Sequence, residues 1–144
     1  MAYTSIYAIR FADVDHAKIL YYPRFLHYFH CAFEDFFEHG IGMPYPRVLN
    51  EHRIGFPSVN VNVDFKAPLR FGDHVAITVD VQRIGSKSVT WGYSGTRVET
   101  NQLCVTGTVV TAVMSMDTYR AVDLPPQYRS WFEAHLVGDK GPAA

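Results

Sequence analysis

A single long helix pattern stands among several strand patterns, and this imbalance narrows the choice of fold. Apolar residues recur at spacings of three and four from Tyr22 to His39, which predicts a helix with one apolar face. Pro23 suits the first helical turn, where its missing N–H costs nothing, and Gly40 suits the cap at the end. We expect a second, short helix at residues 44–51.

The strand patterns lie mainly after the helix. Residues 58–65 alternate strictly between apolar and polar, as do residues 75–81, so each strand is expected to bury one face. Two further strands, 89–99 and 103–116, follow, and the turn residues between the four predict an antiparallel meander. Apolar residues on both faces near the end of the last strand favour a central place in the sheet. In the first of these strands the expected buried face consists of Val59, Val61, Val63 and Phe65.

A first strand is expected at residues 4–11, and a short helix after Pro125-Pro126. One long helix cannot cover both faces of a five-stranded sheet, so we expect it to lie in the concave face of a curved antiparallel sheet, an α+β architecture. The uncovered edge and face invite a second copy of the chain. The length of 144 residues fits one domain, placed at 1–136, with a flexible tail at 137–144.

Charge and cysteine content exclude several classes of protein. Thirteen Lys and Arg residues against fourteen Asp and Glu give a formal charge of −1, which lacks the positive field of a nucleic-acid binder. Cys31 and Cys104 form no short-spaced framework and are expected to be core residues in a reducing compartment. There is no pattern of a leader peptide and no apolar run long enough to cross a membrane, so we expect a cytoplasmic protein.

Two carboxylates, Asp13 and Asp15, lie in a short polar stretch between the first strand and the long helix. The unpaired N–H groups at a helix start can polarise a carbonyl group, which a nearby carboxylate can then attack. An aspartate in this position can also serve only as a loop or cap residue. We expect Asp15 to react and Asp13 to hold the loop, and His16 is a weaker candidate for donating a proton to the leaving group.

Histidines on the long helix raise the question of a metal site. His27, His30 and Glu34 would share one face of the helix. Their spacing is not that of a His-Glu-x-x-His motif, and no cysteine pair accompanies them. We therefore expect no metal site.

Three motifs carry a resemblance to a known family. They are Phe11-Ala12-Asp13-Val14-Asp15 followed by Tyr22-Pro23, the run 64–73 (Asp-Phe-Lys-Ala-Pro-Leu-Arg-Phe-Gly-Asp), and Gly85-Ser86-Lys87-Ser88. With the order of elements, over residues 3–130, the chain resembles the hotdog-fold acyl-CoA thioesterases of the 4-hydroxybenzoyl-CoA thioesterase family. The resemblance implies a sheet wrapped around the helix, homodimers or homotetramers joined through their sheet edges, and acyl-CoA bound across the dimer interface.

The resemblance also implies roles for individual residues. Asp15 matches the nucleophile or general base, and the backbone N–H of Tyr22 matches the donor to the thioester oxygen. Two departures stand in the loop: Lys18 replaces a common Gly, and His16 replaces a common Pro, Ala or Gly. Coenzyme A is part of the substrate, so no separate cofactor is expected. The residues expected to bind substrate are His16, Tyr21, Phe25, Lys66, Arg70, Lys87, Ser88 and Arg120.

The sequence leaves the reaction open in three respects. The acyl group is either aromatic or a fatty acid, and Asp15 acts either directly on the thioester or through water. A hotdog-fold acyl-CoA dehydratase or hydratase is an alternative, although such enzymes place a histidine and a carboxylate elsewhere. A non-catalytic acyl-binding module is a second alternative, and it would not need Asp15.

Overall fold

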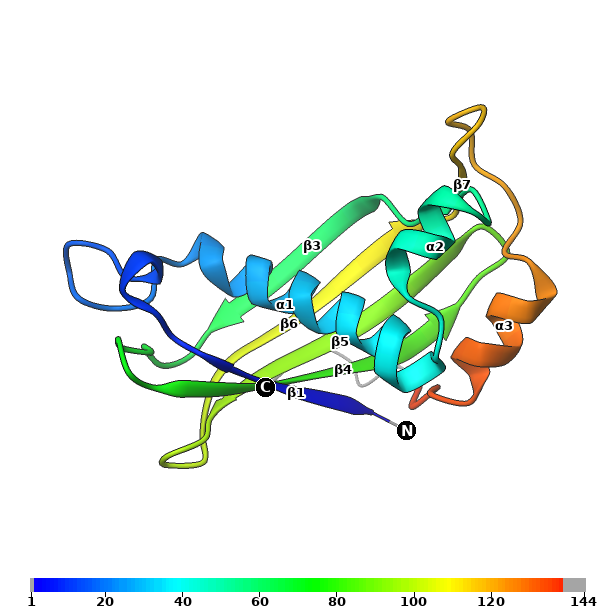
Figure 1. The fold of residues 1–144 in the computed structure, drawn as a ribbon. Coiled ribbons are helices and arrows are strands. Elements are labelled where there is room, and N and C mark those ends of the chain that lie inside the picture. The colour runs from blue at the N-terminus through cyan, green and yellow to red at the C-terminus, as the bar shows by residue number, and fades with distance from the viewer. Residues whose placement is uncertain (1, 139–144) are drawn as a thin grey trace.

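Five antiparallel strands form one sheet, and a long helix lies across one face of it (Figure 1). The strand order is β1-β4-β5-β6-β3, and β2 pairs with β7 in a separate ribbon. The computed structural model describes residues 2–138. Its strands are β1 (Tyr3–Ala8), β2 (Ile54–Gly55), β3 (Ser58–Phe65), β4 (His74–Ile84), β5 (Ser88–Arg97), β6 (Gln102–Ala112) and β7 (Met114–Ser115). Its helices are the 3₁₀ turn η1 (Phe11–Asp13), α1 (Pro23–Asp35), the π-helical turn η2 (Phe36–Ile41), α2 (Tyr45–Asn50) and α3 (Pro126–Glu133).

The apolar face of α1 forms the centre of the core with the sheet. Phe29 stacks on Tyr93 of β5 with 4.7 Å between ring centres, and Phe33 meets Trp91 edge-on at 5.0 Å. Trp91 is fully buried, and its indole N–H donates to Thr111 Oγ1 at 2.9 Å. The helix predicted from periodicity and its place against a curved sheet are confirmed. Its buried residues are Phe25, Tyr28, Phe29, Ala32 and Phe33.

A glycine in β6 allows the helix to approach the sheet closely. A Cβ atom on Gly107 would lie 2.8 Å from Cε2 of Phe29, a separation that side chains do not adopt. The absence of a side chain there makes room for the aromatic ring, because cores are packed without spare volume. The stack of Phe29 on Tyr93 therefore depends on this glycine.

The predicted meander is wrong at one connection. β4, β5 and β6 follow one another in space, but β3 pairs with β6 at the far edge and not with β4. Segment 66–73 is consequently a crossover and not a hairpin. Pro68 and Gly72 signal that the chain bends, but a local turn signal does not specify which strands pair. The crossover runs beside the acidic loop, where the Leu20 N–H donates to the Leu69 carbonyl at 2.7 Å.

The prediction that β3 buries one face is also wrong for most of that face in the single chain. Val59, Val61 and Phe65 are 63%, 45% and 50% exposed. The reason is the edge position of β3: Phe65 meets Phe25 of α1 and Val63 packs partly against the core, but Val59 and Val61 remain exposed. The alternating pattern still defines an apolar face, but the described part of this chain covers it only at the Val63 and Phe65 end.

Smaller differences concern the ends of elements. The first strand ends at Ala8, because the chain turns into η1 at Phe11. The long helix continues into η2, and its cap is Gly42, with φ of 89°, instead of Gly40. The last long strand is central, as predicted, but it leaves the main sheet after Ala112, and β7 pairs with β2 instead.

The C-terminal end of the described chain returns to the sheet. The Val137 N–H donates to the Val81 carbonyl at 2.8 Å, so the first residue of the expected flexible tail pairs with β4. Positions 139–144 of that tail lie outside the described residues. Across residues 2–138, every helix is too short or too polar to cross a membrane.

Candidate active site

The acidic loop between β1 and α1 is a small hairpin closed by a bridge between Val14 and Leu20. The Asp15 N–H donates to the Ile19 carbonyl at 3.0 Å, and the Asp15 carbonyl accepts from the Lys18 N–H at 2.9 Å. The Asp15 side chain is exposed, and its Oδ1 accepts the Ala17 N–H at 2.8 Å. No hydrogen bond to Oδ2 is found from residues 2–138. The loop therefore fixes one carboxylate oxygen and leaves the other accessible.

Asp13 anchors this loop to the long helix. Its carboxylate is buried and accepts the Arg10 N–H at 2.9 Å and the Tyr28 hydroxyl at 2.5 Å. Arg24 lies 3.8 Å away on the same helix. Burial, and then the bond to Asp13, raise the pKa of Tyr28, so its hydroxyl keeps its proton and donates it. These contacts match the loop-holding role expected for Asp13.

The start of α1 presents one backbone donor beside the loop. The Tyr21 N–H is used by the Asp13 carbonyl at 2.9 Å, and Pro23 has no N–H. The Tyr22 N–H, between them, has no hydrogen-bond acceptor among residues 2–138. An unpaired N–H at the positive end of a helix dipole is suited to donate a hydrogen bond to an electron-rich carbonyl oxygen. The sequence analysis expects this N–H to donate to the thioester oxygen.

An apolar groove of about 340 Å³ lies beside the helix start. Phe65 at the end of β3 packs against Tyr22 at 5.9 Å and against Phe25 at 5.4 Å between ring centres. Phe65 was not predicted as a site residue, because the alternating pattern of its strand placed it in the core. The signal that could have identified it is its position directly before Lys66 in the second motif. The groove is lined by Ile19, Leu20, Tyr22, Phe25, Phe65, Lys66, Ala67 and Pro68.

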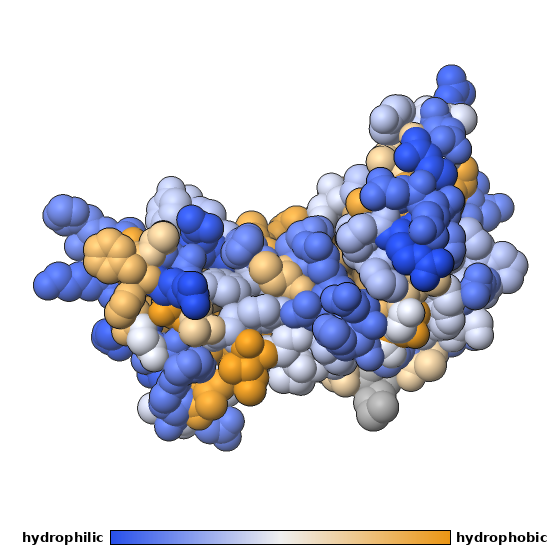
Figure 2. Space-filling view, viewed as in Figure 1, coloured by the Kyte–Doolittle hydropathy of each residue, from blue (hydrophilic) through white to orange (hydrophobic). Residues whose placement is uncertain are grey.

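This end of the molecule exposes several large apolar side chains. The space-filling view shows apolar patches near the acidic-loop end (Figure 2). Such clustered exposure indicates a surface for a ligand or a partner. The large apolar side chains that are exposed in this part of the chain are Phe11, Tyr21, Tyr22, Phe65 and Phe71.

The expected site residues fall into two groups at opposite ends of the sheet (Figure 1). Tyr22, Phe25 and Lys66 line the groove, and Asp15, His16 and Tyr21 lie in the loop segment before it. Arg70 lies in the crossover at the same end, with its side chain exposed. Lys87, Ser88 and Arg120 lie at the other end of the sheet. The 11-residue β4 runs between the two ends, so they are about 35 Å apart. A single chain does not bring the two groups together.

The cations at the far end have partners of their own. Lys87 Nζ lies 2.8 Å from Asp123, and this pair lowers the pKa of the Asp123 carboxyl. Arg120 is exposed in the turn after β7. The main chain of the Lys87 turn is held firmly, because Arg129 donates to the Gly85 carbonyl at 2.7 Å. A phosphate approaching Lys87 would compete with one exposed carboxylate.

The histidines of α1 interact with neighbours on the helix. His30 lies 3.2 Å from Glu34, and His27 Nε2 lies 3.6 Å from Cys31 Sγ. A different trio, Asp35, Glu38 and His39, places possible ligand atoms within 4.8 Å of one another. Asp35 already accepts the Tyr7 hydroxyl, and exposed acidic groups of this kind are common without a metal. We derive no metal chemistry from either group.

A curved antiparallel sheet around one long helix is the hotdog fold. Relatives of this chain are named as thioester hydrolases, which gives the class of enzyme. The family model described as the Thioesterase-like superfamily matches residues 9–132, and the chain belongs to this family.

Individual relatives agree with this assignment. A 1,4-dihydroxy-2-naphthoyl-CoA hydrolase from Nostoc punctiforme is 26% identical over 143 residues, covering 98% of this chain and 93% of the relative. The structure of a gentisyl-coenzyme A thioesterase has a TM-score of 0.81 and 25% identity, covering 90% of this chain and 99% of that one. A thioesterase-superfamily structure from Jannaschia sp. CCS1 has a TM-score of 0.88 and 21% identity, covering 94% and 93%, and shows the shared fold.

Proposed function

We propose that this protein hydrolyses aromatic acyl-CoA thioesters, with Asp15 as nucleophile or general base. The observation that carries the proposal is the position of the Asp15 loop directly ahead of the unpaired Tyr22 N–H, with an aromatic-lined groove beside them. The two named relatives above act, by their names, on naphthoyl and gentisyl thioesters, which are both aromatic. A ring-lined groove suits a flat acyl group because aromatic rings pack favourably edge-to-face or offset.

The reaction divides into three tasks that this chain's groups can perform. The Tyr22 N–H donates to the thioester oxygen as it becomes negative, a contribution worth roughly 10²–10³ in rate. Asp15 either attacks the carbonyl carbon, forming a mixed anhydride, or removes a proton from the attacking water. The carbon–sulfur bond breaks, and the CoA thiolate leaves and takes up a proton. In the first route water then hydrolyses the anhydride, which releases the acid and restores the Asp15 carboxylate; in the second route the attacking water has already formed the acid. Coenzyme A belongs to the substrate, and this route needs no further cofactor.

Two copies of the chain would complete the site. The outer edge of β3 is unpaired within the described chain and exposes apolar side chains, which favours pairing with another strand. A twofold dimer that pairs two β3 strands antiparallel places the Phe65 end of one strand beside the Ser58 end of the other. Within each chain, Ser58 of β3 pairs with Thr111 of β6, and the next residue of β6, Ala112, pairs with Ser88 of β5. Lys87 therefore lies near the Ser58 end of β3, and Lys87 of the partner subunit would approach the groove. The positive charge of this lysine would then face the phosphates in the CoA portion of the substrate.

The test is a substitution of Asp15 in the purified protein. Thiol release from aryl-, short-chain and long-chain acyl-CoA is measured with a thiol reagent, and aryl-CoA is expected to be hydrolysed fastest. Asp15→Asn should lower kcat by at least about 10²-fold, the lower range for a positioned base, while the fold is retained.

Asp117→Asn is the matched control, because Asp117 is exposed and pairs with Arg53 at the far end of the molecule. It should leave hydrolysis unchanged. Activity within a few-fold of the parent in Asp15→Asn, at equal thermal stability, would show that the carboxylate only shapes the loop. Faster hydrolysis of fatty-acyl than of aryl substrates would contradict the aromatic assignment.

A further inference from the structure

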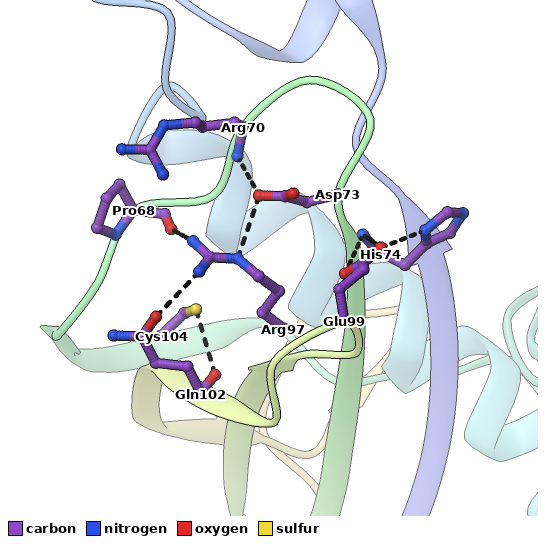
Figure 3. A network of polar contacts seen from close by, with 8 residues as sticks. All are labelled: Pro68, Arg70, Asp73, His74, Arg97, Glu99, Gln102 and Cys104. Carbon is purple, nitrogen blue, oxygen red and sulfur yellow. Dashed lines mark hydrogen bonds and ion pairs between the residues drawn. The ribbon is translucent and has the colours of Figure 1, made fainter.

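Arg97, near the end of β5, is the centre of a polar network close to the acidic loop (Figure 3). Its side chain is 11% exposed. Nε donates to Asp73 Oδ2 at 3.2 Å, Nη1 donates to Gln102 Oε1 at 2.9 Å, and Nη2 donates to the Pro68 carbonyl. The planar guanidinium group holds three acceptors in fixed directions, which a point charge cannot do.

Two of these acceptors mark the limits of one stretch of the crossover. Pro68 begins it and Asp73 ends it, so Arg97 fixes both ends of segment 68–73 against the sheet. The same Asp73 oxygen accepts the Arg70 N–H at 2.8 Å, which closes the turn within the segment. Leu69, between the two ends, is fully buried.

Segment 68–73 in turn holds both ends of the acidic loop. The Leu69 carbonyl accepts the Leu20 N–H at 2.7 Å, at the point where the loop ends. The Asp73 carbonyl accepts the Ile9 N–H at 2.9 Å, just before the loop begins. Leu20 and Pro68 also line the groove, whereas Arg97 does not. A continuous set of bonds therefore links Arg97 to the loop that carries Asp15.

We propose that Arg97 is a positioning residue: by clamping segment 68–73 it sets the place of Asp15 relative to the Tyr22 N–H. The proposal rests on the proposed function for its kinetic consequence. Arg97 acts through the crossover, which it contacts at Pro68, and does not itself line the substrate groove. A small displacement of a reacting group costs up to about 10² in rate, so losing the clamp should affect the chemical step more than substrate binding.

The kinetic experiment compares two substitutions with a control. Arg97→Met removes all three bonds, and Arg97→Lys keeps the charge but not the fork. Both should lower kcat roughly 10- to 100-fold, with a much smaller change in KM. Asp73→Asn weakens the clamp from the other side and should act in the same direction, which keeps the test usable if Arg97→Met does not fold. Arg47→Met, which removes an exposed ion pair with Glu51 on α2, should leave kcat unchanged.

A second readout is independent of thioesterase activity. Amide hydrogen exchange should become at least tenfold faster at Leu20 and Ile9 in Arg97→Lys, while the amides of the central strands stay protected. If the thermal midpoint falls but kcat and Leu20 exchange remain those of the parent, Arg97 is only a stabilising residue and the proposal is wrong. If the parent hydrolyses no thioester, the proposed function fails, and Leu20 exchange still decides whether Arg97 holds the loop.

Discussion

At the scale of single residues, Lys18 shows how the acidic loop tolerates a departure from the family pattern. Its φ is 67°, in the left-handed region that favours glycine. A residue with a side chain adopts this conformation at a cost of about 1–2 kcal/mol. The Lys18 N–H nevertheless donates to the Asp15 carbonyl, so the turn forms with lysine in place of glycine.

Buried tyrosines limit the stability of the folded protein at alkaline pH. Burial is the main cause that raises the pKa of both Tyr45 and Tyr128 to about 12. The Tyr128 hydroxyl also contacts His52 Nδ1 at 2.6 Å. A folded-state pKa above the unfolded value means that folding favours the protonated phenol. This stabilisation is complete below about pH 10 and is lost as the pH rises through 12.

We therefore expect alkaline unfolding to coincide with ionisation of the buried tyrosines. Absorbance at 295 nm and circular dichroism, recorded together between pH 9 and 13, should show a joint transition near pH 12. Tyr128→Phe should make stability fall less steeply with pH in this range. Gradual ionisation of all nine tyrosines near pH 10 with unchanged circular dichroism would contradict this expectation.

At the scale of elements, we expect the exposed edge strand β3 to determine how the chain assembles. Val59 and Val61 on its apolar face are exposed, and its outer edge has no neighbouring strand among the described residues. A long unpaired edge with apolar side chains tends to pair with another chain. The crossover after β3 has a separate task, because it closes the groove and holds the acidic loop.

A charge introduced in the middle of β3 should separate the subunits. In a twofold pairing of β3 strands, Val61→Lys brings two like charges close together across the axis. We expect a dimer or larger assembly for the parent and a monomer for Val61→Lys, measured by gel filtration with light scattering. Ile6→Lys is the control, since Ile6 is equally apolar and 62% exposed on the opposite edge strand, β1. A monomeric parent at micromolar concentration would refute assembly through β3.

At the scale of the whole molecule, the two groups of expected site residues lie at opposite ends of the sheet. Asp15 precedes α1 and the groove lies beside the start of that helix, whereas Lys87 follows β4 and Arg120 follows β7 at the other end; Figure 1 shows these elements. No local rearrangement of a chain with this core would bring them into contact. A twofold dimer would join opposite ends and create two equivalent sites, each built from both chains.

Mixed dimers provide a direct test of shared sites. Lys87→Ala should raise KM for acyl-CoA, an effect that shrinks as salt rises, while Asp15→Asn lowers kcat. When both variants are co-expressed with different tags, one site of the heterodimer carries both changes and the other carries neither. Its kcat/KM, measured well below KM, should recover to about half that of the parent. Sites contained within one chain would each keep one change, and the kcat/KM of the heterodimer would then be only the mean of those of the two single variants.

The parts of the fold that follow local periodicity were predictable. The helix over residues 22–39, the strand over 58–65 and the short terminal helix all correspond to observed elements, because apolar spacing reports local geometry directly. The strand order was not predictable in the same way. Pro68 and Gly72 fixed bends, but the choice of β6 as the neighbour of β3 depends on contacts that are distant in sequence.

The sequence alone determined the type of chemistry to look for, since a carboxylate ahead of a helix start and the three motifs lie within short stretches of chain. Only the tertiary structure decided which residues meet: it placed Phe65 in the groove, separated Lys87 from Asp15, and made Arg97 the clamp of the crossover. The physical reason is that local spacing sets backbone conformation and which face is apolar, whereas strand order and long-range packing set which of those faces and side chains come together.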